Sequence, residues 1–183
     1  MNIIVRKEQI KDYSGVREVI KSAFNREDKD DDFNEWVLVE KIRETDYYIN
    51  ELSLVAEING EIVGHIMFTP LIIKNGNQTF DSLALAPVSV KKEYQKQGIG
   101  KKLVISGIEK ARELGYQSIV VLGQPEYYSK FGFEPASSWK IGLTSDFNDD
   151  CLFVLELVKG SLKGVTGIIE YCQPFYNENG ELI

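Results

Sequence analysis

The sequence predicts a single α/β domain in which helices flank a largely antiparallel sheet. Apolar residues recur at helical spacing over 10–24 and 99–114, whereas residues 52–90 alternate like strands separated by turns. A continuous apolar run at 118–123 has the length of a buried strand. The 183 residues are enough for one domain with its own core. We therefore expect one domain over 1–183, with 140–183 as its C-terminal strand and tail.

The first third of the chain predicts a strand and two helices. Residues 3–6 ("IIVR") are strand-like, and the apolar stripe over 10–24 is that of an amphipathic helix. The run "NREDKDDD" at 25–32 then predicts a solvated loop, since blocks of like charge seldom pack. A second, partly apolar helical stripe follows over 33–42.

An antiparallel meander of three strands is expected next. Asn59 and Gly60 suit a tight hairpin turn, and "NGNQ" at 75–78 provides the second turn. The strands of this meander are residues 52–58, 62–74 and 80–90.

The remaining elements begin with the helix at 99–114, where Gly115 occupies the position of a left-handed C-cap. A short helix should start at Pro125, because a missing N–H costs nothing at the first helical position. Two further strands are predicted at 132–136 and 151–158, before a tail punctuated by glycines.

Composition excludes several classes of function. A formal charge of −7 argues against a protein that neutralises nucleic-acid phosphates. Cys151 and Cys172 lack metal-ligand spacing, and the single histidine, His65, argues against a histidine metal site. No apolar run approaches the ~20 residues of a membrane span, and the amino terminus lacks a signal-peptide pattern. We expect a cytoplasmic protein without metal, nucleic-acid or membrane partners.

Pro87 interrupts the alternating segment "LALAPVSV". Proline cannot donate to a strand ladder, so the strand should bulge or part from its neighbour there. The backbone groups released at this point need a partner. Either water or an extended ligand that carries amide groups would satisfy them.

The following stretch, "VKKEYQKQGIGKKL", is basic in an otherwise acidic chain. Gly98 and Gly100 allow close backbone approach just before a helix, whose free N–H groups favour an anion. Lys96 and Lys101 add positive charge, which indicates a phosphate or pyrophosphate site. The alternative is a tight strand-to-helix turn whose lysines are merely solvated.

Two common phosphate motifs do not fit this stretch. A Walker loop requires Gly-Lys-Ser/Thr, whereas Gly100 precedes Lys101 and Lys102. A dinucleotide fingerprint requires a small third residue where this chain has Leu103.

The segment "VSVKKEYQKQGIGKKL" resembles the acetyl-CoA loop of the GNAT N-acetyltransferases, whose pattern is Gln or Arg, two residues, Gly, one residue, then Gly or Ala. The later segment "PEYYSKFGFEP" is similar to the family's closing element. "VVLGQPEYYSKFGF" and "FVLELVKGSLKGVTGIIEY" are similar to the YhbS-like branch, and the resemblance extends over essentially the whole chain.

This resemblance implies a GNAT fold, with a mixed, mostly antiparallel sheet splayed at the acetyl-CoA strand. It implies an N-acetyltransferase that moves an acetyl group from acetyl-CoA to an amine by direct attack, with Tyr128 as general acid. Backbone groups of Val88, Ser89 and Val90 would pair with the pantetheine amides. The residues implied to hold the pyrophosphate are Gln95, Lys96, Gln97, Gly98, Ile99, Gly100 and Lys101.

Several roles stay open at this level. Tyr128 could simply pack with Tyr127, and Glu57, Asp81 and His65 are candidates for a general base that each have a plain structural alternative. The free N–H of Val88 is a candidate oxyanion donor. The acidic run at residues 27–32 could attract a cationic amine or only solvate a loop.

The amine acceptor, a small molecule or a protein, is not identified, and the protein could be a monomer or a homodimer. A non-catalytic acyl-CoA sensor and an unrelated phosphate-binding protein are the alternative functions.

Overall fold

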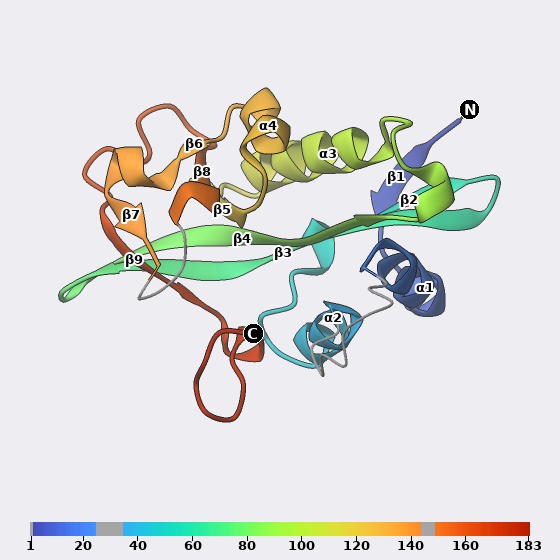
Figure 1. Cartoon of the computed structure of the whole chain (residues 1–183), viewed down its shortest axis with the longest axis horizontal. Helices are drawn as coiled ribbons and strands as arrows, with labels where there is room; N and C mark the ends of the chain where they lie inside the picture. Colours follow the sequence, from blue (N-terminus) through green and yellow to red (C-terminus); the bar gives the residue numbers. More distant parts are fainter. Residues whose placement is uncertain (1, 25–34, 144–148) are drawn as a thin grey trace. The chain divides into compact units, whose positions relative to one another are not determined.

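The computed structural model describes residues 2–24, 35–143 and 149–183 (Figure 1). The acidic run at 25–32 lies outside these residues. The chain forms two compact units. The first unit comprises Met1–Phe68, Ala86–Lys110 and Gln173–Ile183, and the second comprises Thr69–Leu85 and Ala111–Cys172.

The first unit contains the predicted N-terminal helices and most of the meander. Its elements are β1 (Ile4–Lys7), α1 (Tyr13–Phe24), α2 (Glu35–Arg43), β2 (Ser53–Ile58) and the adjoining parts of β3 (Glu61–Asn75), β4 (Gln78–Val90) and α3 (Ile99–Glu113). β1 pairs antiparallel with β2, β2 pairs antiparallel with β3, and β4 is the next neighbour of β3 in the strand order. The meander and the long helix are therefore confirmed, and Gly115 has the left-handed φ of +85° expected of a C-cap.

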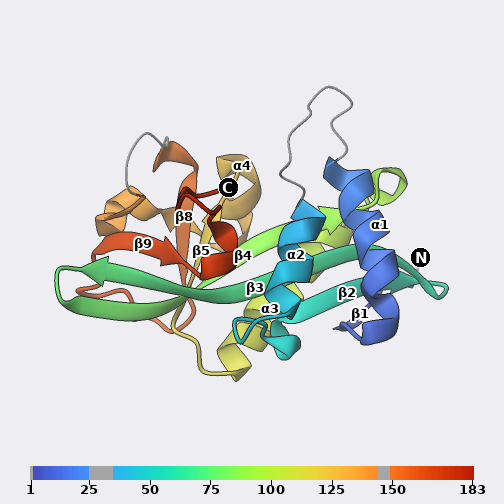
Figure 2. The same ribbon diagram turned by 90° about the horizontal axis from the view of Figure 1, so that it is seen from below.

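Helices cover both faces of the strands in the first unit. α3 lies on one face and α1 and α2 lie on the other (Figures 1 and 2). Gly64 of β3 faces Ile99 and Leu103 of α3, whereas Ile62 faces Gly15 of α1. Residues two apart in a strand normally share a face, and the register shift between Ala56 and Glu57 explains the reversal.

The core of the first unit is formed where these helices meet the strands. Among its fully buried side chains are Val16, Ile20, Ile42, Ile66, Phe68 and Leu103. Ile10, which belongs to the apolar pattern over 10–24, is 81% exposed. The reason is local: residues 10–12 form a separate 3-10 turn before α1 begins at Tyr13.

The second unit is built on a mixed set of strands. Its further elements are β5 (Ser118–Leu122), α4 (Pro125–Tyr128), β6 (Glu134–Pro135), β7 (Ile141–Gly142), β8 (Leu152–Glu156) and β9 (Gly167–Tyr171). β4 and β5 pair in parallel at Leu83 and Ala84, while β5 with β8, β6 with β8 and β3 with β9 pair antiparallel. The predicted mixed, mostly antiparallel sheet is therefore present.

β9 is an element that the glycine-rich tail did not reveal. It pairs with residues 71–74 of β3, so this part of the chain is structured rather than a simple tail. Gly167 has a φ of +134°, and a Cβ there would lie 2.2 Å from the carbonyl oxygen of Lys74. The glycine is therefore required by close backbone approach.

Gly107 lets α3 approach β3 closely, which gives a direct test of the packing. A Cβ at this position would lie 2.4 Å from Cε2 of Phe68, a fully buried side chain, so the ring or the helix would have to shift. We expect Gly107→Ala to lower the free energy of unfolding by about 1–3 kcal/mol, as overpacking does in other cores. Chemical denaturation measures the change, with Ser106→Ala as the neighbouring helical control. Equal stability of the two variants would contradict this packing.

Candidate active site

The loop between β4 and α3 has two residues in the left-handed region. Gly98 has a φ of +84°, and Lys96 has a φ of +62°. Gly100 lies inside α3 instead, one residue after the helix begins at Ile99. A lysine at positive φ is uncommon, and nothing in the sequence pattern marks position 96 for it.

Two glutamine side chains hold this loop together. Gln95 Nε2 donates to the carbonyl oxygen of Val90 at 3.1 Å, and Gln97 Nε2 donates to that of Glu93 at 3.0 Å. Both side chains therefore bond to loop backbone in this structure. These bonds fix the shape of the loop.

The five lysines of the stretch fall into two groups. Lys91 pairs with Glu61 at 2.6 Å, and Lys102 Nζ donates to the carbonyl oxygen of Ile3 at 2.5 Å. Lys92, Lys96 and Lys101 are exposed and make no ion pair with any carboxylate in the described residues.

The first turn of α3 carries no acidic residue, so its positive dipole end and these lysines act together. This arrangement favours an anion.

The last three residues of β4, which precede this loop, differ in solvent exposure. Val88 and Val90 are half-buried, whereas Ser89 is 3% exposed. The Ser89 hydroxyl has no hydrogen-bond partner among the residues that the structure describes. The peptide bond between Ala86 and Pro87 is cis.

Tyr128 belongs to the second unit, at the end of the short helix α4. It is 6% exposed and makes edge contacts with Tyr127 and Phe133, at centroid distances of 5.0 and 5.5 Å. A Cβ on Gly123 would lie 2.1 Å from its ring, so the glycine makes room for it. Burial raises the pKa of Tyr128 above its usual value, because the charged phenolate is poorly solvated there. Its hydroxyl therefore remains a proton donor at neutral pH.

The three base candidates lie in different surroundings. Glu57 accepts hydrogen bonds from Arg6 at 2.8 and 3.0 Å, and Arg6 also binds Asp12, so this carboxylate is in a half-buried ion-pair cluster. Asp81 is exposed on β4. His65 is fully buried on β3. The structure adds no support for any of them as a base.

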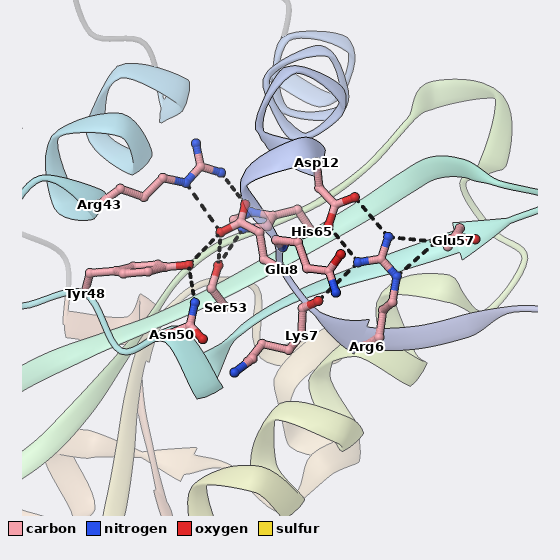
Figure 3. A network of polar contacts seen from close by, with 11 residues as sticks. Arg6, Lys7, Glu8, Asp12, Arg43, Tyr48, Asn50, Ser53, Glu57 and His65 are labelled. Atoms are coloured by element: carbon pink, nitrogen blue, oxygen red, sulfur yellow. Dashed lines mark hydrogen bonds and ion pairs between the residues drawn. The ribbon is translucent and has the colours of Figure 1, made fainter.

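The first unit contains a buried polar network that the sequence patterns did not predict (Figure 3). The carboxylate of Glu8 has no exposed surface and forms an ion pair with Arg43 of α2. Tyr48 and Ser53 donate hydroxyl hydrogen bonds to its Oε2 at 3.1 and 2.7 Å. Ser53 Oγ also lies 3.2 Å from Nε2 of His65. The partners are scattered over the first 65 residues, and no local pattern connects them.

The combination of Ser53, His65 and Glu8 is not a nucleophilic triad. All three side chains are buried, with exposures of 0%, 0% and 1%, so no substrate carbonyl can reach the hydroxyl. In a triad the histidine also lies between the other two, whereas here Ser53 and Glu8 both face Nε2.

Within 2–24, 35–143 and 149–183, no three His, Cys, Asp or Glu side chains gather as metal ligands. No described helix has both the length and the apolar character needed to cross a membrane.

The family model of the acetyltransferase (GNAT) domain matches residues 4–136. The chain therefore belongs to the GNAT family and is an acetyltransferase, as its glycine loop led us to expect.

Two N-acetyltransferases of Escherichia coli are similar to this chain in sequence. The N-acetyltransferase YhbS of Escherichia coli (strain K12) is 29% identical over 174 residues, which are 94% of this chain and 98% of YhbS. YjhQ of the same strain, also an N-acetyltransferase, is 38% identical over 129 residues, 70% of this chain and 68% of YjhQ.

Two solved structures show the same fold. The crystal structure of Escherichia coli YhbS in complex with CoA has a TM-score of 0.84 and 28% identity, covering 96% of this chain and 92% of that one. A GNAT acetyltransferase from Brucella melitensis in complex with acetyl-CoA has a TM-score of 0.76 and 29% identity, covering 95% and 98%. The predicted GNAT fold is thereby confirmed.

His65 gives a prediction for the pH dependence of stability. Burial, opposed in part by Glu8 and assisted by Arg43, lowers its pKa from 6.5 to about 4. As the pH falls below 6.5, His65 therefore becomes protonated in the unfolded chain but stays neutral in the folded protein until the pH approaches 4. We expect the free energy of unfolding to drop by on the order of 3 kcal/mol between pH 6.5 and 4 from this group.

The variant His65→Gln isolates this contribution. Denaturant unfolding at several pH values should show a shallower slope for the variant than for the wild type between pH 6.5 and 4. Asp12 acts in a separate range, because Arg6 lowers its pKa and its stabilisation is lost only in stronger acid. Parallel profiles for the two proteins would show that His65 does not titrate as described.

Proposed function

We propose that this acetyltransferase uses acetyl-CoA to acetylate an amine on a small molecule or a protein by direct attack. The loop before α3 carries the proposal, because it combines two left-handed residues, a helix start without acidic residues and three lysines free of carboxylate partners in the described chain. The CoA and acetyl-CoA bound by the two similar structures support the same assignment.

The pyrophosphate would lie against the segment from Gln95 to Lys101. Helix N-termini bind phosphates because their first N–H groups have no partner inside the helix. The two glutamines keep the loop in shape, and Lys96 and Lys101 supply full charges.

The pantetheine arm would follow β4, bonding through backbone groups of Val88, Ser89 and Val90. The Val90 carbonyl already accepts from Gln95, and its second lone pair remains available. The arm would thus extend the strand, as added peptides extend sheet edges.

The reaction joins the amine nitrogen to the thioester carbonyl carbon and breaks the carbon–sulfur bond. The N–H of Val88 would stabilise the oxyanion that forms between these steps. Tyr128 would give its hydroxyl proton to the departing thiolate and recover a proton, released by the amine, through solvent. Because an alkylamine has a pKa of ~10.4, the acceptor begins as an ammonium ion at neutral pH. Because a thiol has a pKa of ~8.5, the products are one amide, one thiol and one proton released to solvent.

Calorimetry with CoA tests the anion site. We expect Lys96→Ala and Lys101→Ala each to raise the Kd for CoA about threefold to tenfold, because each removes one charged contact. The dependence of affinity on salt should fall in both variants, since fewer charges are screened. Lys163→Ala, an exposed lysine of the second unit, is the matched control and should bind like the wild type.

Two outcomes would contradict the anion site. One is a wild-type protein that shows no heat with millimolar CoA. The other is ATP competing as strongly as CoA, which would indicate a general phosphate site instead of an acyl-CoA site.

Tyr128→Phe tests the general acid and distinguishes an enzyme from a sensor. The substitution removes one oxygen and keeps the ring that packs on Tyr127 and Phe133. We expect kcat to fall about 100-fold while the Kd for CoA stays unchanged. The assay follows thiol release from acetyl-CoA with a panel of amines, which also identifies the acceptor.

The pH profile of the wild type adds a second readout for this role. Because burial raises the pKa of Tyr128, the rate should show no decline from its ionisation below about pH 10. An unaltered kcat in Tyr128→Phe would remove this residue from the mechanism. Absence of turnover with every amine, together with tight CoA binding, would favour the sensor.

A further inference from the structure

A row of polar side chains crosses three neighbouring strands of the first unit and ends at Glu8, the residue after β1. Val55 of β2 is the register partner of His65, so Ser53, two residues earlier, shares its face. The Lys91 N–H donates to the Val63 carbonyl at 2.9 Å, and a regular antiparallel register continued from this bond pairs Ser89 of β4 with His65 of β3.

The position of Gly64 supports this register. A Cβ on Gly64 would lie 3.3 Å from the Ser89 carbonyl oxygen, and its other neighbours are Ile99 and Leu103 of α3. Gly64 therefore faces α3, so His65 and its partner Ser89 face the opposite side, where Glu8 and Arg43 lie. Side chains directly opposite in such a pair have Cβ atoms about 5 Å apart.

The hydrogen bonds of Ser53 define the tautomer of His65. A hydroxyl has one proton, and that of Ser53 is donated to the Glu8 carboxylate at 2.7 Å. Its oxygen can therefore only accept from Nε2 of His65, 3.2 Å away. Nε2 carries the proton, and Nδ1 of the neutral ring carries a lone pair.

Two polar atoms in this row lack partners. Neither Nδ1 of His65 nor Oγ of Ser89 has a hydrogen-bond partner in the described part of the chain, and both are buried. Leaving such a group unsatisfied costs about 1–3 kcal/mol. One atom needs a donor and the other has a proton to donate, and they lie on facing residues.

We propose that the Ser89 hydroxyl donates to Nδ1 of His65, directly after rotation about χ1 or through one water, and that Ser89 and His65 thereby position the acetyl-CoA strand. The chain of bonds runs from Ser89 through His65 and Ser53 to Glu8, whose charge Arg43 balances. It ties β4 to the buried ion pair at the residue between Val88 and Val90. The positioning role rests on the proposed function, whereas the hydrogen bond itself does not.

Nuclear magnetic resonance can observe the hydrogen bond without any assay of activity. The chain has one histidine, so a long-range proton–nitrogen spectrum of labelled protein contains a single imidazole. At pH 7 we expect the Nε2-protonated form, with the Nδ1 resonance displaced upfield because it accepts a bond. Ser89→Ala should move that resonance downfield, toward the value of an unbonded ring nitrogen.

Ser82→Ala is the matched control for this experiment. Ser82 is also a buried serine of β4, 2% exposed, but its hydroxyl bonds to Ser118 at 2.8 Å in the second unit. This variant should leave the imidazole spectrum unchanged. A ring protonated on Nδ1, or a Nδ1 resonance indifferent to Ser89→Ala, would overturn the proposal.

Steady-state kinetics test the positioning role. Ser89→Ala should raise KM for acetyl-CoA about threefold to tenfold and change kcat less than about twofold, as expected for loss of one hydrogen bond that acts through the backbone. Ser89→Thr, which retains the hydroxyl, should restore KM, and Ser82→Ala should leave it unchanged.

The imidazole spectrum and the kinetic measurements test different parts of the proposal, so each part can be refuted without the other. An unchanged KM in Ser89→Ala, with the spectrum altered as expected, would overturn the positioning role and leave the hydrogen bond. A wild type that binds no CoA would refute the proposed function, and the spectrum would still decide the bond.

Discussion

Burial of the Glu8 carboxylate is the constraint on which the arrangement of the first unit depends. A buried charge is tolerated only when it is paired and hydrogen-bonded, and Glu8 recruits Arg43, Tyr48 and Ser53 for that purpose. These partners come from α2, the segment after it and β2, so satisfying one charge brings distant parts of the chain together. Loss of Arg43 alone would leave the charge unbalanced, at a cost of about 3–5 kcal/mol.

The strands of the first unit consequently have two unlike faces. Toward α3 they present glycine and apolar side chains, such as Gly64 and Phe68, which allow close packing. Toward α1 and α2 they present the Glu8 network and a second cluster in which Arg6 joins Asp12 to Glu57 (Figure 3). Close packing on one face, together with hydrogen bonds and ion pairs on the other, fixes the positions of the helices against the strands.

Local patterns in the sequence were sufficient for the helices, the meander, Gly98 and Gly115, because spacing and glycine conformation are properties of short segments. They did not reveal β9, whose pairing with β3 joins residues about a hundred positions apart. The left-handed Lys96 was missed because that conformation is uncommon outside glycine. The Glu8 network was missed because nothing local marks a charged residue as buried. For Tyr128, burial in an aromatic cluster agrees with either packing or catalysis.

The contacts at Gly64 and Gly107 have a consequence for ligand capture. At both positions a glycine of one element packs directly against side chains of the other, Gly64 against Ile99 and Leu103 and Gly107 against Phe68, so the amino end of α3 has little freedom to rise or tilt. A binding site whose hydrogen-bond donors are already ordered loses little conformational entropy when its ligand binds. The rate at which an anionic ligand binds at the amino end of α3 should then depend on diffusion and charge attraction, without a slow rearrangement of the protein.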